Sequence, residues 1–166
     1  MSEVRTVTAY VGLGSNLENP RRQVEVALRE LAELRDSRLL SHSSLYRSRA
    51  IGLRNQPDFI NAVASLSTRL DAHALLDALQ AIEQVHRRRR DGERWGPRTL
   101  DLDLLVYGDG RIDTPRLRVP HPEMANRAFV LFPLSEIAPE GMEIPGIGPL
   151  RRLAQGLSGD GVERLR

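Results

Sequence analysis

The stretch Thr99–Tyr107 reads Thr-Leu-Asp-Leu-Asp-Leu-Leu-Val-Tyr and has the apolar–polar alternation of a β-strand. Residues two apart in a strand point to the same face. We therefore expect the alternating leucines in the core and Asp101 and Asp103 on the opposite face, about 6.6 Å apart. Adjacent carboxylates repel each other, and a bound cation relieves the repulsion; Mg²⁺ suits such ligands because it binds carboxylates together with substrate phosphates. An isolated Asp-x-Asp pair is more often only a strand with one face in water.

Upstream of this strand the elements follow the order strand, helix, strand, strand, helix. They are a strand at Val7–Gly14, a helix from Pro20 to Leu34 capped by Asn19, strands at Arg38–Tyr46 and Phe59–Ser67, and a helix capped by Asp71. Two adjacent strands between two helices favour an α+β, ferredoxin-like (split βαβ) sandwich over a doubly wound sheet. We expect a mostly antiparallel sheet with the helices packed on it, in a single domain spanning residues 1–166.

The neighbouring segments carry further expectations. A polar, arginine-rich loop, His86–Arg98, should follow the second helix. After the strand at Thr99–Tyr107, Gly108–Gly110 predicts a hairpin turn. Arg111–Val119 then predicts a returning edge strand that is interrupted by a proline. Short helices are expected within His121–Glu136 and near Leu150–Gly156. The second helix has apolar residues at helical spacing, namely Leu75, Leu76, Leu79, Ile82 and Val85.

All 24 basic residues of the chain are arginine. The absence of lysine excludes a phosphate-loop lysine and Schiff-base or pyridoxal chemistry, so any phosphate must be held by guanidinium groups. The absence of cysteine excludes disulfides, zinc–thiolate sites and thiol nucleophiles. A net charge of +2 is weak support for nucleic-acid binding. With no apolar signal region and no run of membrane-spanning length, we expect a cytoplasmic protein with no membrane partner.

Arginines gather just upstream of the two aspartates. Four consecutive arginines, Arg87–Arg90, precede the segment Arg94-Trp95-Gly96-Pro97-Arg98. Paired carboxylates beside an arginine cluster are a natural site for the polyphosphate of a magnesium nucleotide. The alternative is a solvated helix C-terminus, where the helix dipole favours cations. The only tryptophan, Trp95, is interpreted either as part of a lid over a nucleotide or as an ordinary anchor to the core.

Two other clusters are candidates for ligand contact. Gly12–Leu17 ends the first strand, and its glycines permit a ligand to approach the backbone closely. Gln56–Asn61 opens the third strand, with Phe59 and Asn61 on one face. A heteroaromatic ring could stack on Phe59 while the amide of Asn61 reads its edge. The alternative is a core phenylalanine and a turn-forming asparagine.

Four clusters stand in a fixed order along the chain. They are Gly14-Ser15-Asn16, Gln56-Pro57-Asp58-Phe59-Ile60-Asn61, Arg94-Trp95-Gly96-Pro97-Arg98-Thr99-Leu100-Asp101-Leu102-Asp103, and Val119-Pro120-His121-Pro122 with Arg127 and Phe129. Together they resemble the 6-hydroxymethyl-7,8-dihydropterin pyrophosphokinase family of folate biosynthesis, from about residue 7 to Pro139. The resemblance implies a Mg-dependent transferase, a 2-amino-4-hydroxy-6-hydroxymethyldihydropteridine diphosphokinase, which moves pyrophosphate from ATP to the pterin hydroxymethyl group and releases AMP. Members of the family are usually ferredoxin-like.

The resemblance also implies roles for individual residues. Asp101 and Asp103 would bind two Mg²⁺ ions, and Arg88 and Arg98 would stabilise the transferring group. Phe59 and Phe129 would sandwich the pterin ring, and Asn61 would read its edge. The other residues at the pterin would be Gly14, Trp95 and the backbone groups of Ser48 and Ile51. The residues at the nucleotide would be Gln80, Glu83, Arg88, Arg90, Trp95, Arg98, Leu104, Arg116, Arg118, His121 and Arg127. The implied partners are the small molecules ATP and hydroxymethyldihydropterin, bound by a monomer without nucleic acid.

Three positions depart from the family pattern. Pro122 stands where some members have tyrosine, Arg118 where a small hydroxyl residue is familiar, and Ser48-Arg49-Ala50 where the family has a loop with proline. Two other functions stay open. A nucleic-acid-binding module of this fold would stack bases on sheet aromatics, although two acidic residues on the sheet oppose it. An ordinary kinase would transfer one phosphoryl group and release ADP instead of AMP.

Overall fold

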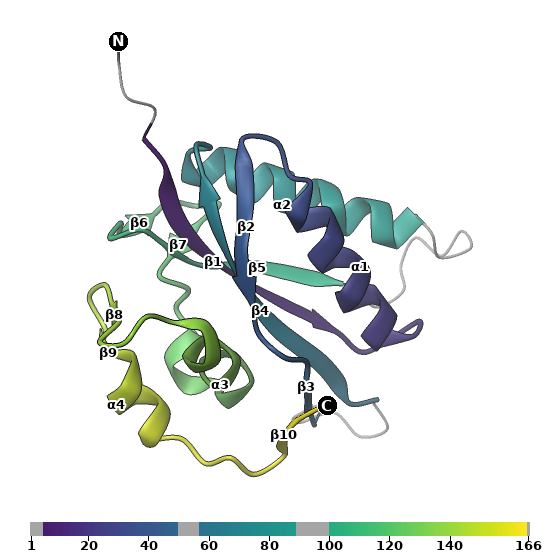
Figure 1. The fold of residues 1–166 in the computed structure, drawn as a ribbon, viewed down its shortest axis with the longest axis vertical. Helices are drawn as coiled ribbons and strands as arrows, with labels where there is room; N and C mark the ends of the chain where they lie inside the picture. The colour runs from purple at the N-terminus through teal and green to yellow at the C-terminus, as the bar shows by residue number, and fades with distance from the viewer. Residues whose placement is uncertain (1–4, 50–56, 89–99, 166) are drawn as a thin grey trace.

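The computed structural model describes residues 5–49, 57–88 and 100–165 (Figure 1). Its main element is a six-stranded sheet in which five strands follow the order β10-β3-β4-β1-β5, while β2 also pairs with β4. Every pairing in this sheet is antiparallel. The strands are β1 (Val7–Ser15), β2 (Ser37–His42), β3 (Tyr46–Ser48), β4 (Phe59–Thr68), β5 (Asp101–Tyr107) and β10 (Val162–Arg164).

The helices connect strands that are not neighbours in the sheet. Helix α1 (Pro20–Ala32) leads from β1 to β2, on the far side of β4, and α2 (Ala72–Arg88) leads from β4 to β5, on the far side of β1. This is the split βαβ arrangement. The predicted α+β, ferredoxin-like sandwich with a mostly antiparallel sheet is confirmed.

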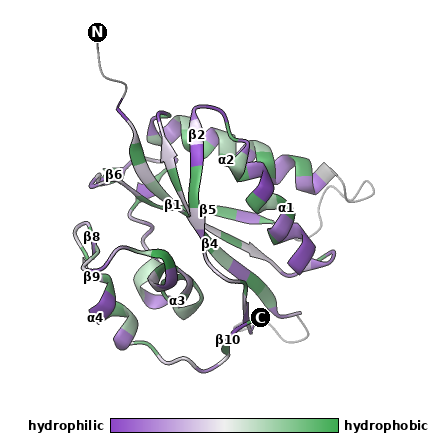
Figure 2. Ribbon diagram, in the orientation of Figure 1, coloured by the Kyte–Doolittle hydropathy of each residue, from purple (hydrophilic) through white to green (hydrophobic). Residues whose placement is uncertain are grey.

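The sheet has helices on both faces. Figure 1 shows α1 and α2 over one face, and α3 (Ala128–Ile137) with the short α4 (Leu150–Gln155) beside the other. Apolar residues run along the central strands and through α3, whereas the outward side of α1 is hydrophilic (Figure 2). Helix α1 is amphipathic because only one stripe of it is buried. Helix α3 is apolar on most sides because most of its surface is covered. None of the helices in the described part of the chain is long and apolar enough to cross a membrane.

Two hydrophobic cores result, one on each face. The first packs Leu102 and Leu104 against α1 and α2, and the second packs Leu105 against α3. The sheet serves both because successive side chains of a strand point to opposite faces: Val11 lies in the first core and Tyr10 in the second. In β5 a bulge modifies this alternation: Tyr10 pairs with Val106 and Val11 with Leu104, which leaves Leu105 as an extra residue. The predicted alternation of β5 therefore holds from Asp101 to Leu105, and beyond it the bulge leaves Val106 in the same core as Leu105.

The expected second strand, Arg38–Tyr46, is two strands in the structure. β2 pairs with the later part of β4 and β3 with its beginning. Between them, Ser43 donates its backbone N–H to the Val63 carbonyl (2.8 Å) and accepts the Val63 N–H on its hydroxyl (2.9 Å). A side chain thus replaces a ladder hydrogen bond, so the chain interrupts the strand without leaving a buried polar group unpaired.

Helix α2 is longer than predicted. The Asp71 carboxylate caps it by accepting the Ala74 N–H (2.8 Å), as expected. Its final turns continue through His86 to Arg88, so the arginine-rich segment does not begin as a loop at His86. Val85 is exposed and His86 is buried instead, with ring nitrogens bonded to Gln23 and Glu30 of α1. The apolar stripe predicted through Val85 was wrong at its end because a paired polar ring fills the buried position.

Other local predictions differ in detail. Asn19 precedes α1 but lies in the left-handed region (φ 60°) and makes no side-chain cap; its carbonyl accepts the Gln23 N–H (3.1 Å). The segment after β5 does not return to the sheet edge. It forms a separate ribbon of β6 (Ile112–Asp113) and β7 (Arg118–Val119). The rest of the chain holds the 3₁₀ helix η1 (Met124–Asn126) and the ribbon of β8 (Glu143–Ile144) and β9 (Gly148–Pro149).

Candidate functional site

A cavity of about 610 Å³ opens between β1, β4 and β5, the start of α3 and the end of the chain. Its volume is typical of a site for a small organic molecule. Eight residues predicted from the sequence line it together: Gly14, Ser48, Phe59, Asn61, Asp101, Asp103, Arg127 and Phe129. The fold therefore unites the acidic pair with the candidate ring-binding residues, which come from separate parts of the chain.

The acidic pair lies on the cavity face of β5, as predicted. Asp101 is half-buried and Asp103 exposed. Their partners in β1 are Gly14 and Gly12, which have no side chains, so β1 leaves the space beside both carboxylates open. On the outer edge of β5, the Leu102 N–H donates to Glu83 Oε2 (2.8 Å), which ties α2 to the strand between the two aspartates.

These carboxylates fit a hard divalent cation. Oxygen donors two residues apart on one strand face are ligands of the kind that Mg²⁺ prefers. Among the described residues they form no cluster with a third acidic, histidine or cysteine side chain. Water and substrate phosphates would suit the other ligand positions, which is the usual environment of Mg²⁺ at a nucleotide.

Asn61 is fixed at the floor of the cavity. It is 6% exposed, and the Ser48 hydroxyl donates to its Oδ1 (2.6 Å). Its Nδ2 points toward β1, where a Cβ on Gly14 would lie only 3.1 Å away. The hydroxyl of Ser48 thus sets the direction of the amide, and the missing side chain of Gly14 leaves room for it.

Two aromatic rings line the same cavity. Phe59 begins β4 and Phe129 lies in the first turn of α3. The guanidinium carbon of Arg127 is 5.7 Å from the centre of the Phe129 ring, a cation–π arrangement that orients both side chains. Two half-buried rings and a fixed amide are suited to a flat heteroaromatic ligand with a polar edge.

A family model described as 7,8-dihydro-6-hydroxymethylpterin-pyrophosphokinase (HPPK) matches residues 10–139. The chain belongs to the HPPK family. The match covers both aspartates, both rings and Asn61, and it ends before α4 and β10.

Individual relatives agree with this assignment. The chain is 49% identical over 156 residues to the 2-amino-4-hydroxy-6-hydroxymethyldihydropteridine pyrophosphokinase of Pseudomonas aeruginosa, covering 94% of this chain and 95% of that protein. It is 48% identical over 132 residues to the protein of the same name from Haemophilus influenzae, covering 80% and 82%. A crystal structure of Plasmodium falciparum HPPK-DHPS A437G with SDX-DHP superposes with a TM-score of 0.71 at 16% identity. That match covers 92% of this chain but 46% of the other, and it shows a shared fold only.

Most of the residues predicted for the nucleotide lie outside the cavity. Arg116 binds Asp77 Oδ1 (2.6 Å) and Gln80 Oε1 (3.4 Å) on the exposed side of α2. Arg118 lies 3.3 Å from Asp113 in the small ribbon, and His121 Nδ1 accepts the Glu123 N–H (3.1 Å). These side chains lie along the outer edge of β5, next to the ribbon and α2. The structure does not bring them into the cavity with Asn61 and the rings.

Leu104 could contact a nucleotide only through its backbone. Its side chain is 3% exposed and packs in the first core. The backbone of Leu104, in contrast, faces the outer edge of β5. The N–H of Leu102 points away from β1, to Glu83, and backbone groups two residues apart in a strand point the same way. A contact from Leu104 would therefore come from its backbone at the outer edge of β5.

Several predicted residues fall outside the described part of the chain. These are Ile51, Arg90, Trp95 and Arg98. Arg88 is the last residue of α2, and its side chain is not described. Their roles stay predictions from the sequence.

Part of the cavity wall was not predicted from the sequence. Leu157, Ser158, Asp160, Gly161 and Val162 all line it. Their segment is rich in glycine and polar residues and has no periodicity that marks a strand. Its position depends on pairing with β3, which is distant in the sequence.

Proposed function

We infer that the chain transfers pyrophosphate from ATP to the hydroxymethyl oxygen of 6-hydroxymethyl-7,8-dihydropterin and releases AMP, a step of folate biosynthesis. One observation carries this function within the family. A single cavity joins the paired carboxylates of β5 to two aromatic rings and a fixed amide. These are the groups needed to hold a polyphosphate and a pterin next to each other.

The pterin would lie between Phe59 and Phe129, with its polar edge against Asn61. Stacking on two rings supplies most of the affinity for a flat ring, and the amide supplies orientation. Because Ser48 already occupies one side of Asn61 Oδ1, the Nδ2 group is the available donor and the second lone pair of Oδ1 the available acceptor. Gly14 completes this half of the site, and Ile51 and Trp95 are proposed to contribute from the neighbouring segments.

The phosphates would lie over Asp101 and Asp103. These residues would hold two Mg²⁺ ions, which when bound supply neutralisation of the phosphate charge. Arg88 and Arg98 are proposed to stabilise the transferring group from the arginine-rich segment. Guanidinium groups serve here because the chain has no lysine.

The nucleotide would extend from the cavity along the outer edge of β5. The backbone of Leu104 and the side chains of Gln80, Arg116, Arg118 and His121 lie there, and they are proposed to bind the base, ribose and phosphates. Glu83 anchors β5 through Leu102 and would hold this edge in place. Arg90 and Arg127 complete the proposed set, with Arg127 held at the Phe129 ring.

The chemical step is an in-line displacement at the β-phosphorus. The pterin hydroxyl oxygen forms the new bond, and the bond from the β-phosphorus to the oxygen bridging the α- and β-phosphates breaks, so AMP leaves with that oxygen. The hydroxyl proton passes to one of the cavity carboxylates, and no covalent enzyme intermediate forms. Most of the rate would come from positioning and charge stabilisation.

Binding of the pterin tests the cavity. We expect hydroxymethyldihydropterin to bind the chain saturably in the presence of Mg²⁺ and a non-hydrolysable ATP analogue. Phe59→Ala should raise its dissociation constant about tenfold or more because a stacking surface is lost. Pterin binding that is insensitive to Phe59 would place the ligand elsewhere and reject this site.

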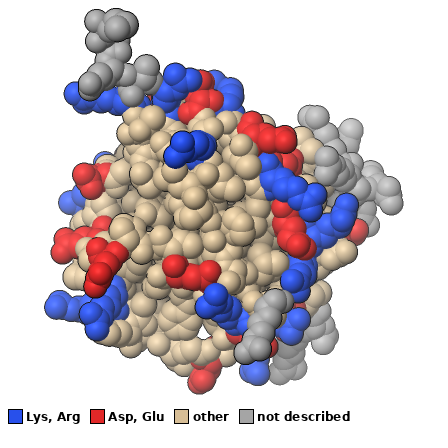
Figure 3. Space-filling view, in the orientation of Figure 1, with Lys and Arg blue, Asp and Glu red and all other residues tan. Residues whose placement is uncertain are grey.

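A nucleic-acid-binding module is the main rival. On the face seen in Figure 3, arginines are interspersed with acidic side chains around a broad uncharged surface. Two aspartates also stand in the cavity where bases would stack. Salt-sensitive RNA binding without Mg²⁺ would support the rival.

We further propose that the protein works as a monomer, as one domain and in the cytoplasm, on small-molecule substrates alone. Sedimentation at working concentration tests whether it is a monomer.

A further inference from the structure

The last segment of the chain forms a wall of the cavity. Strand β10 adds to the sheet beside β3, with Val162 opposite Ser48 and Arg164 opposite Tyr46. Two further backbone bonds extend this pairing: the Arg49 N–H donates to the Gly161 carbonyl (3.1 Å), and the Leu165 N–H to the Leu45 carbonyl (2.8 Å). We call residues 157–165 the C-terminal segment.

This wall belongs to the pterin half of the site. In the sheet order β10-β3-β4-β1-β5, the C-terminal segment lies at the edge opposite to β5 with its two aspartates. Its nearest neighbours are β3, which carries Ser48, and β4, which carries Phe59 and Asn61. A displacement of this segment would therefore change the ring-binding half and leave the carboxylates of β5 in place.

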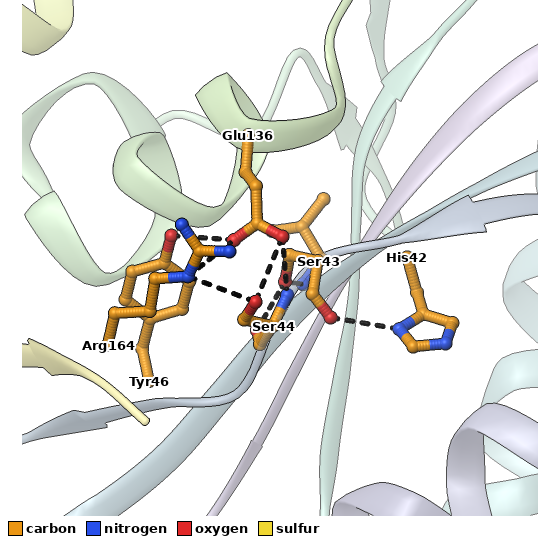
Figure 4. A network of polar contacts seen from close by, with 7 residues as sticks. His42, Ser43, Ser44, Tyr46, Glu136 and Arg164 are labelled. Carbon is orange, nitrogen blue, oxygen red and sulfur yellow. Dashed lines mark hydrogen bonds and ion pairs between the residues drawn. The ribbon is translucent and has the colours of Figure 1, made fainter. Parts of the chain in front are cut away.

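One carboxylate joins the C-terminal segment to β3 and α3. Glu136 of α3 accepts the Ser44 N–H (2.8 Å) and the Ser44 hydroxyl (3.1 Å) on Oε2, and the Tyr46 hydroxyl (2.8 Å) on Oε1. Arg164 of β10 lies 3.7 Å from Oε1 and donates to the Ser44 hydroxyl (3.1 Å). Figure 4 shows these side chains converging beneath α3. We call Glu136, Ser44, Tyr46 and Arg164 the Glu136 cluster.

The Glu136 cluster also affects the position of Phe129. Glu136 and Phe129 are seven residues apart in α3, almost two turns, so their side chains leave the same face of the helix. This face flanks the buried stripe of Val130, Leu131 and Leu134, through which α3 packs on the sheet. The bonds from Glu136 to Ser44 and Tyr46 fasten this flank of α3 to the edge of the sheet, and with it the position of the Phe129 ring.

The charge state of Glu136 suits this role. Burial by itself raises the pKa of the carboxyl, but the hydrogen bonds from Ser44 and Tyr46 and the charge of Arg164 lower it below its ordinary value. The group is therefore ionised at neutral pH and accepts all its hydrogen bonds. Charge-assisted bonds of this kind are shorter and stronger than neutral ones.

We propose that Glu136 is a positioning residue for the pterin: it holds the Phe129 ring and the C-terminal segment as two walls of the ring-binding half, and so sets the affinity for the pterin without touching it. The proposal rests on the function inferred above, in which this cavity binds the pterin. It extends the site beyond residue 139, where the match to the HPPK family ends.

Glu136→Gln tests the proposal. The amide keeps the shape of the carboxylate but presents two donors on one side, so it cannot accept from both Ser44 and Tyr46. We expect the dissociation constant and KM for the pterin to rise about tenfold. The KM for ATP and the affinity for an ATP analogue should stay within about twofold, a split that general loosening of the fold would not produce.

Arg164→Ala is a second variant, which should destabilise the fold less than Glu136→Gln does. Its side chain is 62% exposed, and its removal releases β10 from the cluster while Ser44 and Tyr46 remain on Glu136. We expect a smaller rise in the pterin KM in the same direction. Glu163→Gln is the matched control: the change is chemically the same and on the same strand, but Glu163 is exposed and points to the other face from its neighbours. It should bind the pterin as the wild type does.

The outcomes separate the positioning role of Glu136 from the proposed function. If Phe59→Ala weakens pterin binding while Glu136→Gln and Arg164→Ala do not, the positioning role is wrong and the proposed function stands. If Phe59→Ala has no effect, the cavity is not the pterin site and both are wrong. Equal losses for pterin and ATP in Glu136→Gln would also reject the positioning role.

Discussion

The Ser48 hydroxyl donates a hydrogen bond of 2.6 Å to Oδ1 of Asn61, and this pair fixes an amide at the floor of the cavity. Both residues are almost fully buried. The pair joins neighbouring strands, since Ser48 ends β3 and Asn61 lies near the start of β4. A binding group held this way loses little freedom when a ligand arrives.

Removing the hydroxyl should weaken the pterin interaction. Without Ser48, the Asn61 amide can rotate and its Oδ1 loses a partner. We expect Ser48→Ala to raise the dissociation constant for the pterin about three- to tenfold, and Asn61→Ala to raise it more. In a double-mutant cycle the two changes should not add, because one acts through the other. Additive effects would show that Ser48 does not act through the amide.

Adding a methyl group to the opposite strand should disturb the same amide. A Cβ at Gly14 would lie 3.1 Å from Asn61 Nδ2, tighter than an ordinary contact, and Ser48 limits how far the amide can move. We expect Gly14→Ala to lower pterin affinity about fivefold or more while the protein stays folded.

Gly156→Ala is the control for this change. The Cβ there would meet only backbone oxygens at 3.6 and 3.7 Å, ordinary van der Waals distances. It should bind the pterin as the wild type does. Normal pterin binding by Gly14→Ala would mean that Asn61 is not confined by β1.

The acidic pair should matter for turnover far more than for folding. Loss of one group that stabilises a transition state costs about 10²–10³ in turnover. We expect a reduction of that size for Asp103→Ala, and a comparable one for Arg98→Ala and Arg88→Ala, in steady-state assays with Mg²⁺ as the only metal. Asp103 is exposed, so its replacement should leave the melting temperature nearly unchanged. Asp109→Asn, an exposed change in the turn after β5, serves as the control; near-normal turnover of Asp103→Ala would remove the carboxylates from the mechanism.

The free energy of unfolding should depend on pH in the alkaline range because of Tyr46. Burial, the hydrogen bond to Glu136 and the Glu136 charge raise the pKa of Tyr46 from 10.0 to about 12, against a small opposing effect of Arg164. Because the folded-state pKa is raised, the contribution of Tyr46 is complete below pH 10 and is lost as the pH rises from 10 toward 12. The stability advantage of the wild type over Tyr46→Phe should therefore shrink across this range in urea unfolding. An advantage that is constant from pH 8.5 to 11 would contradict the assignment.

The parts of the fold that depend on local pattern were predictable from the sequence. The Leu–Asp alternation placed Asp101 and Asp103 on the cavity face, and the order of elements led to the split βαβ arrangement. Asp71 caps α2 as expected because capping depends on neighbouring residues alone.

Features that depend on distant partners were not predictable in this way. Ser43 interrupts the second strand by bonding Val63, and His86 replaces Val85 in the buried stripe because Gln23 and Glu30 satisfy its ring. The same holds in the site: the wall at Gly161 exists only because β10 pairs with β3. The resemblance to the family implied the ring-binding residues and a backbone contact from Ser48, but not the hydrogen bond by which the Ser48 hydroxyl orients Asn61.

The nucleotide product tests the central claim most directly. Wild-type protein is incubated with ATP, Mg²⁺ and hydroxymethyldihydropterin, and the phosphorus-containing species are followed by ³¹P NMR. We expect AMP and a pterin diphosphate in equal amounts, formed only when the pterin is present and strongly reduced in Asp103→Ala. Release of ADP with a pterin monophosphate, or hydrolysis of ATP that does not need the pterin, would contradict it.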